Sequence, residues 1–206
     1  MSQGQFPFFD KDTFPVREFR AEDGVRIVPG GTSIRRGAYV AKGAIVMPPA
    51  YINVGAYVDE GTMVDSHATI GSCAQVGKNI HISAATQIGG VLEPAGAMPT
   101  IIEDGAFIGG NCGIYEGTIV QEGAVIASGV IITSSTALYD ATKGEFVPRN
   151  GDGRVVVPRG AVVVSGSRPV SKGPGAQSGV HLYCPVIVKY RDEKTAGSVT
   201  LEDMLR

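Results

Sequence analysis

The sequence predicts an all-β fold, a parallel β-helix built from hexapeptide repeats, and two periodic features carry this prediction. A branched aliphatic residue, here called the anchor, recurs every six positions in two long runs. A Gly or Asn stands three positions after most anchors, and a small residue usually follows it. A period of six matches neither an α-helix nor an ordinary strand. The anchors are Val28, Ile34, Val40, Val46, Ile52, Val58, Val64, Ile70, Val76, Ile82, Ile88, Ile102, Ile108, Ile114, Val120, Ile126, Ile132 and Leu138, with a last pair at Val157 and Val163.

Each hexad is expected to form one short strand and one corner. Gly37 and Asn79 illustrate the corners, because Gly and Asn adopt positive φ at little cost. Small residues such as Ala44 and Thr62 are expected inside, where the walls converge. Three hexads close a triangular coil of 18 residues, and successive coils stack about 4.8 Å apart. A β-sandwich with chance spacing is the alternative, and 18 anchors in two unbroken runs argue against it.

The open ends of such a stack expose strand edges, which promote aggregation unless they are covered. Residues 1–24, rich in Phe, are expected to cap the first coil, and residues 25–179 to form the β-helix domain. Residues 180–206 are expected to add a strand and a short C-terminal helix. Thr200 and Asp203 have the spacing of a capping box at the start of that helix.

The period breaks at two places, and both are expected to be loops. Residues 89–101 add about eight residues to one hexad, and residues 139–156 form a polar, Gly-rich segment. Loops that leave a rigid solenoid often carry its function, because the coils supply only a platform. Tolerated surface insertions are the alternative interpretation.

Charge and composition argue against several classes of protein. With a net charge of −2, the 206-residue chain is not expected to bind nucleic acid. It has no run of 18 apolar residues, so no membrane span is expected. The first residues lack the basic and apolar regions of a signal peptide, and Cys73, Cys112 and Cys184 show no CxxC spacing. These features predict a cytoplasmic protein with reduced, packed thiols and no metal.

Several strings in the chain are more specific than the hexads alone. They are NVGAYVDEGTMVDSHATIGSCAQVGKNIHIS, IGGVLEP, PTIIED, FIG, YDATKGE, VVVSG and LYCPVIVK. Over residues 24–206 the chain resembles the tetrahydrodipicolinate N-succinyltransferases, enzymes of bacterial lysine and diaminopimelate biosynthesis. Generic hexapeptide acyltransferases lack these strings.

The resemblance implies a left-handed β-helix, an exception to the usual handedness of parallel crossovers. It also implies a homotrimer with active sites between subunits. Succinyl-CoA would donate its acyl group to the amine of tetrahydrodipicolinate or a related amino dicarboxylate. Acetyl-CoA is the alternative donor.

Two residues match family positions that act on the acceptor. Asp65, in TMVDSHAT, matches an acidic residue implicated at the substrate amine, where a carboxylate orients the amine or removes its proton. Arg26, in GVRIVP, matches an arginine that binds a substrate carboxylate, a task suited to the planar guanidinium. A solvated corner residue and a surface arginine are the respective alternatives.

The chain also departs from the family pattern. The resembling enzymes carry a mostly helical N-terminal domain, which this sequence is expected to lack. Asn111 replaces an arginine, Gly113 replaces a glutamate regarded as catalytically important, and His67 replaces a tryptophan, whereas Glu116 matches a different family glutamate. These changes remove charges from the expected substrate pocket. His67 is either a partial acid–base substitute or a polar corner residue.

These departures leave three functional interpretations open. The first is the family activity itself. The second is a specialised paralogue that uses acetyl-CoA and a different lysine-branch acceptor, as in the biosynthesis of a tabtoxin-like β-lactam. The third is a pseudo-enzyme that binds CoA without turnover.

The CoA contacts are expected along late coils. Backbone groups there suit the pantetheine amides, with Ser128 and Gly166 as candidates, and Lys189 is a candidate for the phosphates. Arg168, Lys172 and Arg191 add positive charge in the same part of the sequence, although a solvated surface is the more common meaning of such residues.

Two other classes fit the repeat but not its details. A γ-type carbonic anhydrase would need three converging histidines, and His67 and His81 occupy unequal positions in their hexads, with His181 elsewhere. An ice-binding solenoid would need threonines on a flat outer face, whereas Thr62, Thr86 and Thr118 are predicted to point inward.

Overall fold

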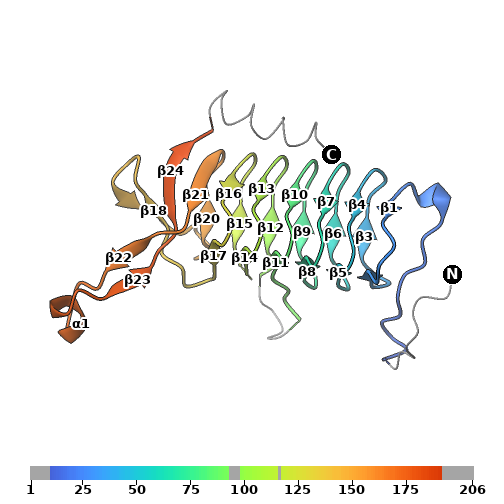
Figure 1. Ribbon diagram of the computed structural model, residues 1–206, viewed down its shortest axis with the longest axis horizontal. Coiled ribbons are helices and arrows are strands. Elements are labelled where there is room, and N and C mark those ends of the chain that lie inside the picture. Colours follow the sequence, from blue (N-terminus) through green and yellow to red (C-terminus); the bar gives the residue numbers. More distant parts are fainter. Residues whose placement is uncertain (1–9, 93–97, 116, 192–206) are drawn as a thin grey trace.

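The computed structural model is an elongated prism with three faces, wound from short parallel strands (Figure 1). It describes residues 10–92, 98–115 and 117–191. The chain passes from face 1 to face 2 to face 3 and then starts the next coil. The fold is the left-handed parallel β-helix of hexapeptide repeats that the sequence predicts.

The strands of each face pair with the equivalent strands of the coils before and after. Face 1 contains β1 (Arg26–Ile27), β4 (Ile45–Val46), β7 (Met63–Val64), β10 (His81–Ile82), β13 (Phe107–Ile108), β16 (Val125–Ile126) and β21 (Ala161–Val164). Face 2 contains β2 (Ser33–Ile34), β5 (Tyr51–Ile52), β8 (Thr69–Ile70), β11 (Gln87–Ile88), β14 (Gly113–Ile114) and β17 (Ile131–Ile132). Face 3 contains β3 (Tyr39–Val40), β6 (Tyr57–Val58), β9 (Gln75–Val76), β12 (Ile101–Ile102), β15 (Ile119–Val120) and β20 (Val156–Val157).

The anchors form the core. Ile52 pairs with Ile34 and with Ile70, each 18 residues away, and its side chain is fully buried. The small residues also lie inside, and Thr62 donates its hydroxyl to the Gly77 carbonyl at 2.7 Å. β-Branched side chains lose little rotamer freedom in such strands, so one inward residue per hexad is enough to hold each wall.

The first coil departs from the predicted phase. Ile27, and not Val28, pairs with Val46 and packs against the core. The first coil therefore holds one extra residue, which the turn at Gly30 and Gly31 absorbs with φ of 142° and 91°. The assignment of Val28 as the anchor was wrong because Ile27 and Val28 are both branched and aliphatic, and only Val28 lies six positions before Ile34.

The last predicted anchor of the second run also lies outside the coils. Leu138 is buried, but it precedes β18 (Tyr139–Asp140) in the second excursion. The coil continues instead at Val157, which pairs with Val120, and at Val163, which pairs with Ile126. The last pair of anchors is therefore placed as the period predicts.

Residues 10–24 run along the first coil. The Arg17 amide donates to the Ile34 carbonyl at 2.7 Å, and the Arg36 amide donates to the Pro15 carbonyl at 2.8 Å. Phe19 packs against the core, with the Arg17 guanidinium 4.4 Å above its ring. A short 3-10 turn, η1 (Ala21–Asp23), leads into β1. This segment supplies hydrogen bonds to the edge strand β2.

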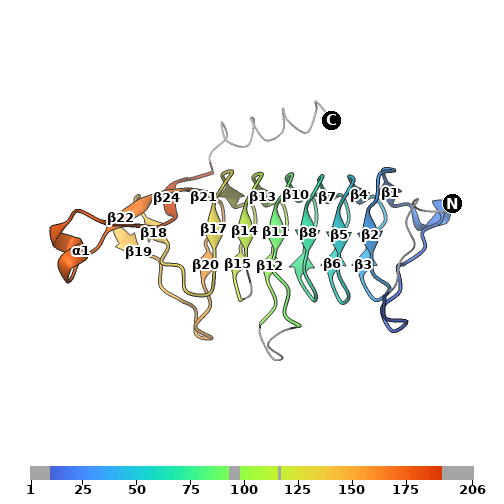
Figure 2. The same cartoon turned by 60° about the horizontal axis from the view of Figure 1, so that its bottom comes forward.

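Both excursions leave the prism at the edge between faces 2 and 3. The first joins β11 to β12 and the second joins β17 to β20 (Figure 2). Arg154, which is 7% exposed, ties them together by donating to the carbonyls of Pro99 and Gly117. Burial lowers the pKa of this guanidinium, and the nearby Asp152 carboxylate opposes that effect.

Beyond the last coil the chain forms an arm and a covering strand. The arm is a hairpin of β22 (Ser167–Pro169) and β23 (His181–Tyr183), with α1 (Pro174–Gln177) at its tip (Figure 1). β24 (Val186–Tyr190) then pairs antiparallel with β21. None of the helices in the described chain has the length and hydropathy needed to cross a bilayer. The helix predicted at 200–206 lies outside the described residues.

The second excursion is fastened to β24 by a buried carboxylate. Asp140 lies on β18, which pairs with β24 and with β19 (Glu145–Phe146), and it is 1% exposed. Its oxygens accept hydrogen bonds from the Thr142 amide and hydroxyl and from the Tyr190 hydroxyl, at 2.7–2.9 Å. Burial alone would raise the pKa of Asp140, but these hydrogen bonds outweigh it and lower the pKa to about 2.

Replacing Asp140 with Asn should therefore destabilise the protein at neutral pH and less so in acid. A carboxyl with a lowered pKa contributes stability above its unfolded pKa of about 3.9, and this contribution is lost as the pH falls toward 2. We expect Asp140→Asn to lower the melting temperature by about 5 °C at pH 7. The gap to the parent should narrow between pH 4 and pH 2. Asp12→Asn, at an exposed carboxylate, is the control, and melting curves for Asp140→Asn that run parallel to the parent across this range would contradict the assignment.

Candidate functional site

Most of the predicted site residues gather on one edge of the prism. The edge where face 1 turns into face 2, here called the 1–2 edge, carries Asp65 and His67 on one coil, Asn111 two coils later and Ser128 on the coil after that. Gly166 follows β21 at the same edge on the last coil. In Figure 2 this edge runs along the top of the prism, and the first excursion hangs from the opposite edge of face 2.

The 1–2 edge is narrow and lined with small residues. Backbone hydrogen bonds run along it, from the amides of Ala85, Asn111 and Gly129 to carbonyls of the preceding coil, each at 2.9 Å. At Gly109 a Cβ atom would lie 2.5 Å from the Ser128 nitrogen, so adjacent coils leave no room for a side chain there. Beyond Asp65 this edge therefore consists mainly of Gly, Ala and Ser residues, with the exposed Asn111 among them.

Backbone strain is concentrated on the same edge. In the part of the chain that the structure describes, five non-glycine residues have positive φ, and three of these lie here: His67 at 61°, Ala85 at 58° and Asn111 at 56°. The corner residues along the edge between faces 3 and 1 are mostly Gly. Left-handed backbone at non-glycine residues costs free energy and often marks functional positions.

Asp65 stands directly after β7, with its side chain 29% exposed. Its amide donates to the Ile82 carbonyl at 2.9 Å, and its Oδ1 accepts a hydrogen bond from the Ser66 amide at 2.6 Å. Its Oδ2 lies 3.5 Å from Nε2 of His81 on β10. The carboxylate is therefore accessible, with one oxygen held by a backbone hydrogen bond and the other facing His81.

His81 was not among the predicted site residues. Its side chain is 13% exposed and meets the Phe107 ring edge-on at 5.2 Å. Its proximity to Asp65 follows from the repeat. His81 lies 16 positions after Asp65, which is two positions before the residue that stands beside Asp65 on the next 18-residue coil. Residues two apart in a strand point to the same side. The coil length was therefore the signal that would have found it.

Arg26 shares face 1 with this pair. The outward residues of the face are in register, so that Arg26 stands beside Ile45, Ile45 beside Met63, and Met63 beside His81. Arg26 is exposed and lies two coils from Met63, which places it about 10 Å away along the axis. That separation allows one guanidinium and one carboxylate to act on different ends of a small molecule.

His67 and Asn111 are exposed corner residues of the 1–2 edge. The His67 amide donates to the Pro49 carbonyl. Gly113 lies just past this edge, buried at the start of β14. Here a Cβ atom would lie 2.5 Å from Cε2 of Tyr115, whose hydroxyl donates to Oε1 of Gln87 at 2.8 Å. The Tyr115 ring therefore occupies the space that a longer side chain at position 113 would need.

The candidates for CoA contacts lie toward the far end. A Cβ at Gly166 would lie 2.6 Å from Val186, which explains glycine there by close packing alone. Lys189 pairs with Val162 on face 1 and is exposed. Arg191 instead donates to the carbonyls of Gly105 and Gly123 on the edge between faces 3 and 1.

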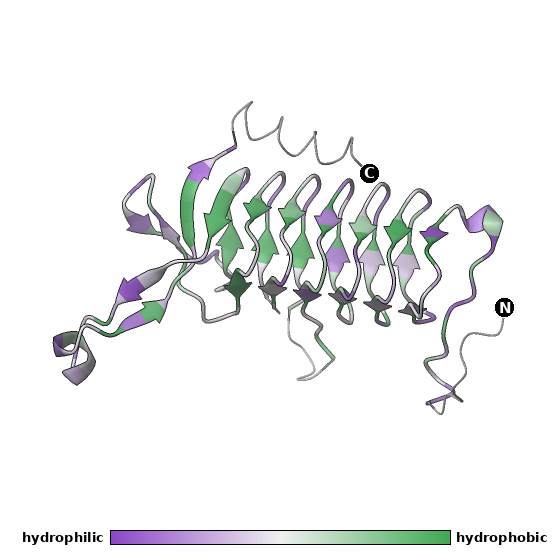
Figure 3. Cartoon of the chain, in the orientation of Figure 1, coloured by the Kyte–Doolittle hydropathy of each residue, from purple (hydrophilic) through white to green (hydrophobic). Residues whose placement is uncertain are grey.

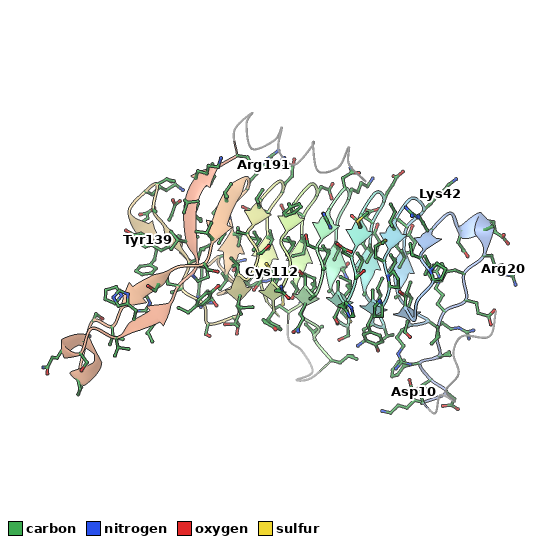
Figure 4. The ribbon with its side chains drawn as sticks, in the orientation of Figure 1. Asp10, Arg20, Lys42, Cys112, Tyr139 and Arg191 are labelled. Atoms are coloured by element: carbon green, nitrogen blue, oxygen red, sulfur yellow. The ribbon has the colours of Figure 1, made fainter. Side chains whose placement is uncertain are left out.

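In Figure 4, Arg191 lies along the top of the prism, and Cys112 lies below it. Burial raises the pKa of the Cys112 thiol, as it does that of Cys184, and both thiols are enclosed. Both therefore act as packing groups. Cys73 is half-buried, and its sulfur would meet a Cβ at Gly55.

A hollow on the described surface lies away from the 1–2 edge. It has a volume of about 410 Å³ on face 3, lined by Tyr57, Gln75, Glu103, Asp104 and Glu122 among others. None of the predicted site residues lines it. Its acidic lining would repel CoA phosphates, so the chemistry of the 1–2 edge is the better guide. Across the described ranges, no three His, Cys, Asp or Glu side chains meet in a group able to hold a metal ion.

Known proteins with similar sequences are N-succinyltransferases. The profile of the hexapeptide repeat of succinyl-transferase matches residues 99–134. The 2,3,4,5-tetrahydropyridine-2,6-dicarboxylate N-succinyltransferase of Methylococcus capsulatus is 52% identical over the whole chain, which covers 73% of that enzyme. The chain belongs to the tetrahydrodipicolinate N-succinyltransferase family. The Legionella pneumophila (strain Corby) enzyme of the same name is 51% identical over 90% of this chain and 63% of its own length.

The chain is shorter than its relatives. The match to the Thioalkalivibrio sulfidiphilus enzyme of the same name is 53% identical, but spans 62% of this chain and 42% of that enzyme. Among solved structures, the acetyltransferase domain of PglB from Neisseria gonorrhoeae FA1090, in complex with acetyl coenzyme A, is 17% identical with a TM-score of 0.45. That match covers 68% of this chain and 54% of the other.

The contact between Gly113 and Tyr115 can be tested by adding one methyl group. Gly113→Ala should displace the Tyr115 ring and weaken its hydrogen bond to Gln87, lowering the melting temperature by about 3 °C. In a Tyr115→Ala background the same substitution should cost clearly less, because the ring is gone and only Cδ1 of Ile131, at 3.0 Å, stays close to the added Cβ. Gly151→Ala, where a Cβ would meet nothing within 4 Å, is the matched control. An equal loss in both backgrounds would show that the ring does not fill this space.

Proposed function

We propose that the protein is an acyl-CoA-dependent N-acyltransferase that moves a succinyl group to the amine of tetrahydrodipicolinate or a related amino dicarboxylate. The observation that carries the proposal is identity of 52% over the whole chain to an enzyme of that name. The grouping of Asp65, His67, Asn111 and Ser128 on one edge supports it.

The reaction needs a neutral amine next to the thioester. The amine nitrogen attacks the thioester carbonyl, an N–C bond forms, and the C–S bond breaks to release the CoA thiol. The nitrogen loses one proton and the thiolate gains one, so the reaction consumes no net acid or base. In this proposal the accessible carboxylate of Asp65 orients the amine and accepts its proton. No enzyme nucleophile is needed, which agrees with the enclosed thiols of Cys112 and Cys184.

The acceptor would bind across the early coils. Arg26 is exposed about 10 Å from the Asp65 level, within reach of a carboxylate on a molecule whose amine meets Asp65. A guanidinium binds a carboxylate through two parallel hydrogen bonds, which fixes orientation as well as affinity. His67 and Asn111 stand on the same edge, where they would contact the acceptor or the acyl group.

The donor would bind along the 1–2 edge toward the last coils. Beyond Asp65 this edge is formed mainly by Gly, Ala and Ser residues, with Asn111 the one larger exposed side chain on coils β10–β17, and such an edge suits a thin pantetheine arm. Backbone groups at this edge would contact the amides of such an arm, with Ser128 and Gly166 as candidate contacts. Lys189, at the far end of face 1, would meet the phosphates.

A second subunit would complete the site. One chain presents its excursions on the edge between faces 2 and 3, opposite the 1–2 edge, so its own loops do not cover Asp65. We therefore include a homotrimer in the proposal, with the site between neighbouring copies. The free thiols of the described chain fit the cytoplasmic location expected from the sequence.

One observation favours a second candidate function. The Tyr115 ring fills the space beside Gly113, where the resembling enzymes have a glutamate, and Asn111 carries no charge. A site with this wall would suit acetyl-CoA or a different lysine-branch acceptor. The specialised paralogue is therefore the alternative to the family activity.

Thiol release from purified protein tests the proposal directly. Succinyl-CoA and acetyl-CoA would each be supplied with and without tetrahydrodipicolinate. Acceptor-dependent thiol release with succinyl-CoA is the expected result. Faster release with acetyl-CoA would favour the specialised paralogue. CoA binding without turnover, for either donor, would reject the proposed enzyme activity.

Asp65→Asn should lower kcat by at least about tenfold, because the amide cannot accept the proton. The oligomeric state and the melting temperature should stay close to the parent, since Asn keeps the shape and an acceptor for the Ser66 amide. Asp59→Asn, at a corresponding corner between faces 3 and 1, is the matched control. A rate near that of the parent would remove Asp65 from the mechanism.

A further inference from the structure

We propose that His81 is a positioning residue for Asp65, and that the two side chains act as one unit in acyl transfer. This inference rests on the proposed function, because it assigns a partner to the carboxylate that meets the acceptor amine. Its basis is the distance of 3.5 Å between Nε2 of His81 and Oδ2 of Asp65.

The imidazole is held firmly enough to position another group. His81 lies in β10, which pairs with β7 on one side and β13 on the other. Its side chain is 13% exposed, and the Phe107 ring packs edge-on against it at 5.2 Å. A ring held by two neighbouring coils has little rotational freedom, so Nε2 presents a fixed point to the carboxylate.

The carboxylate is restrained from the other side by backbone. Oδ1 of Asp65 accepts the Ser66 amide at 2.6 Å, while Oδ2 faces His81. Each oxygen has a second lone pair, so one acceptor position stays available for an incoming amine. At 3.5 Å the contact with His81 is longer than a good hydrogen bond. Catalytic hydrogen bonds often tighten only when substrate is bound.

The consequence for the reaction is geometric. An exposed aspartate at a corner samples several rotamers, and only some of them aim an oxygen at an amine on the 1–2 edge. A donor at Nε2 selects the rotamer in which Oδ2 faces β10 on face 1. Small errors in the placement of a catalytic group cost rate by large factors.

A packing role is the competing explanation, and two substitutions separate it from positioning. His81→Phe keeps a ring against Phe107 but removes the donor. His81→Gln keeps an amide donor near the position of Nε2 but removes the ring. If His81 positions Asp65, we expect His81→Phe to lower kcat by about tenfold with KM changed by less than about threefold, and His81→Gln to recover most of the loss.

The decisive comparison is the double variant. A residue that acts through Asp65 has nothing left to position once Asp65 is changed. Asp65→Asn combined with His81→Phe should therefore turn over within about twofold of Asp65→Asn alone. Multiplied losses in the double variant would overturn the proposal, as would parent-like kcat in His81→Phe. His181→Ala, on the arm, is the histidine control and should match the parent.

A spectroscopic measurement keeps the inference separate from the proposed activity. Ring-nitrogen NMR spectra of the parent and of Asp65→Asn, with the His67 and His181 signals assigned by single substitutions, report whether His81 senses the carboxylate. A shifted His81 Nε2 signal in Asp65→Asn supports the pairing of the two side chains, whether or not the parent turns over substrate. Absence of turnover in the parent would reject the proposed function but not this pairing. An unchanged signal in folded protein would overturn the pairing.

Discussion

The stacking of 18-residue coils is the constraint on which the rest of the structure depends. One inward aliphatic side chain per hexad holds each wall, and parallel pairing fixes every coil to the next in register. Because the register is the same in every regular coil, outward residues form columns along the prism. Neighbouring residues within a column are about 4.8 Å apart. Arg26, Asp65 and His81 owe their spacing to this lattice and not to any loop. A site built on such walls is rigid, which is what positioned acid–base chemistry requires.

The outward columns change character along the prism. On face 1 the charged or polar outward residues Arg26 and His81 lie on early coils, among Ile45 and Met63, whereas the later coils present Phe107 and Val125. Figure 3 shows the same trend, with more hydrophobic strands from β12 to β21 than before them. In the proposed function, a charged acceptor suits the early coils and an apolar pantetheine arm the later ones. Asp65 lies near the boundary, where amine and thioester would have to meet.

The fold was predictable in almost every coil because the core is periodic. The phase failed at Ile27, where two adjacent aliphatic residues compete for one inward position and a Gly pair takes up the extra residue. The site was less predictable. Asp65 and Asn111 fell on one edge as their phase implies, but His81 required the 18-residue offset to be combined with strand alternation. The Tyr115 ring over Gly113 follows from packing between neighbouring columns, which no single-sequence pattern displays.

Strain on the 1–2 edge links these local details to function. The corners at His67, Ala85 and Asn111 have left-handed backbone although none of them is glycine. Each of these residues therefore carries a conformational strain that glycine would not have. The side chains at His67 and Asn111 are exposed, so burial does not repay this cost. On the edge between faces 3 and 1, where no candidate site residue lies, Gly61, Gly105 and Gly123 form the corresponding corners, and Asn79 is the non-glycine exception. Polar groups held outward by strained corners, beside the Asp65 carboxylate, are what the proposed binding role of this edge would require.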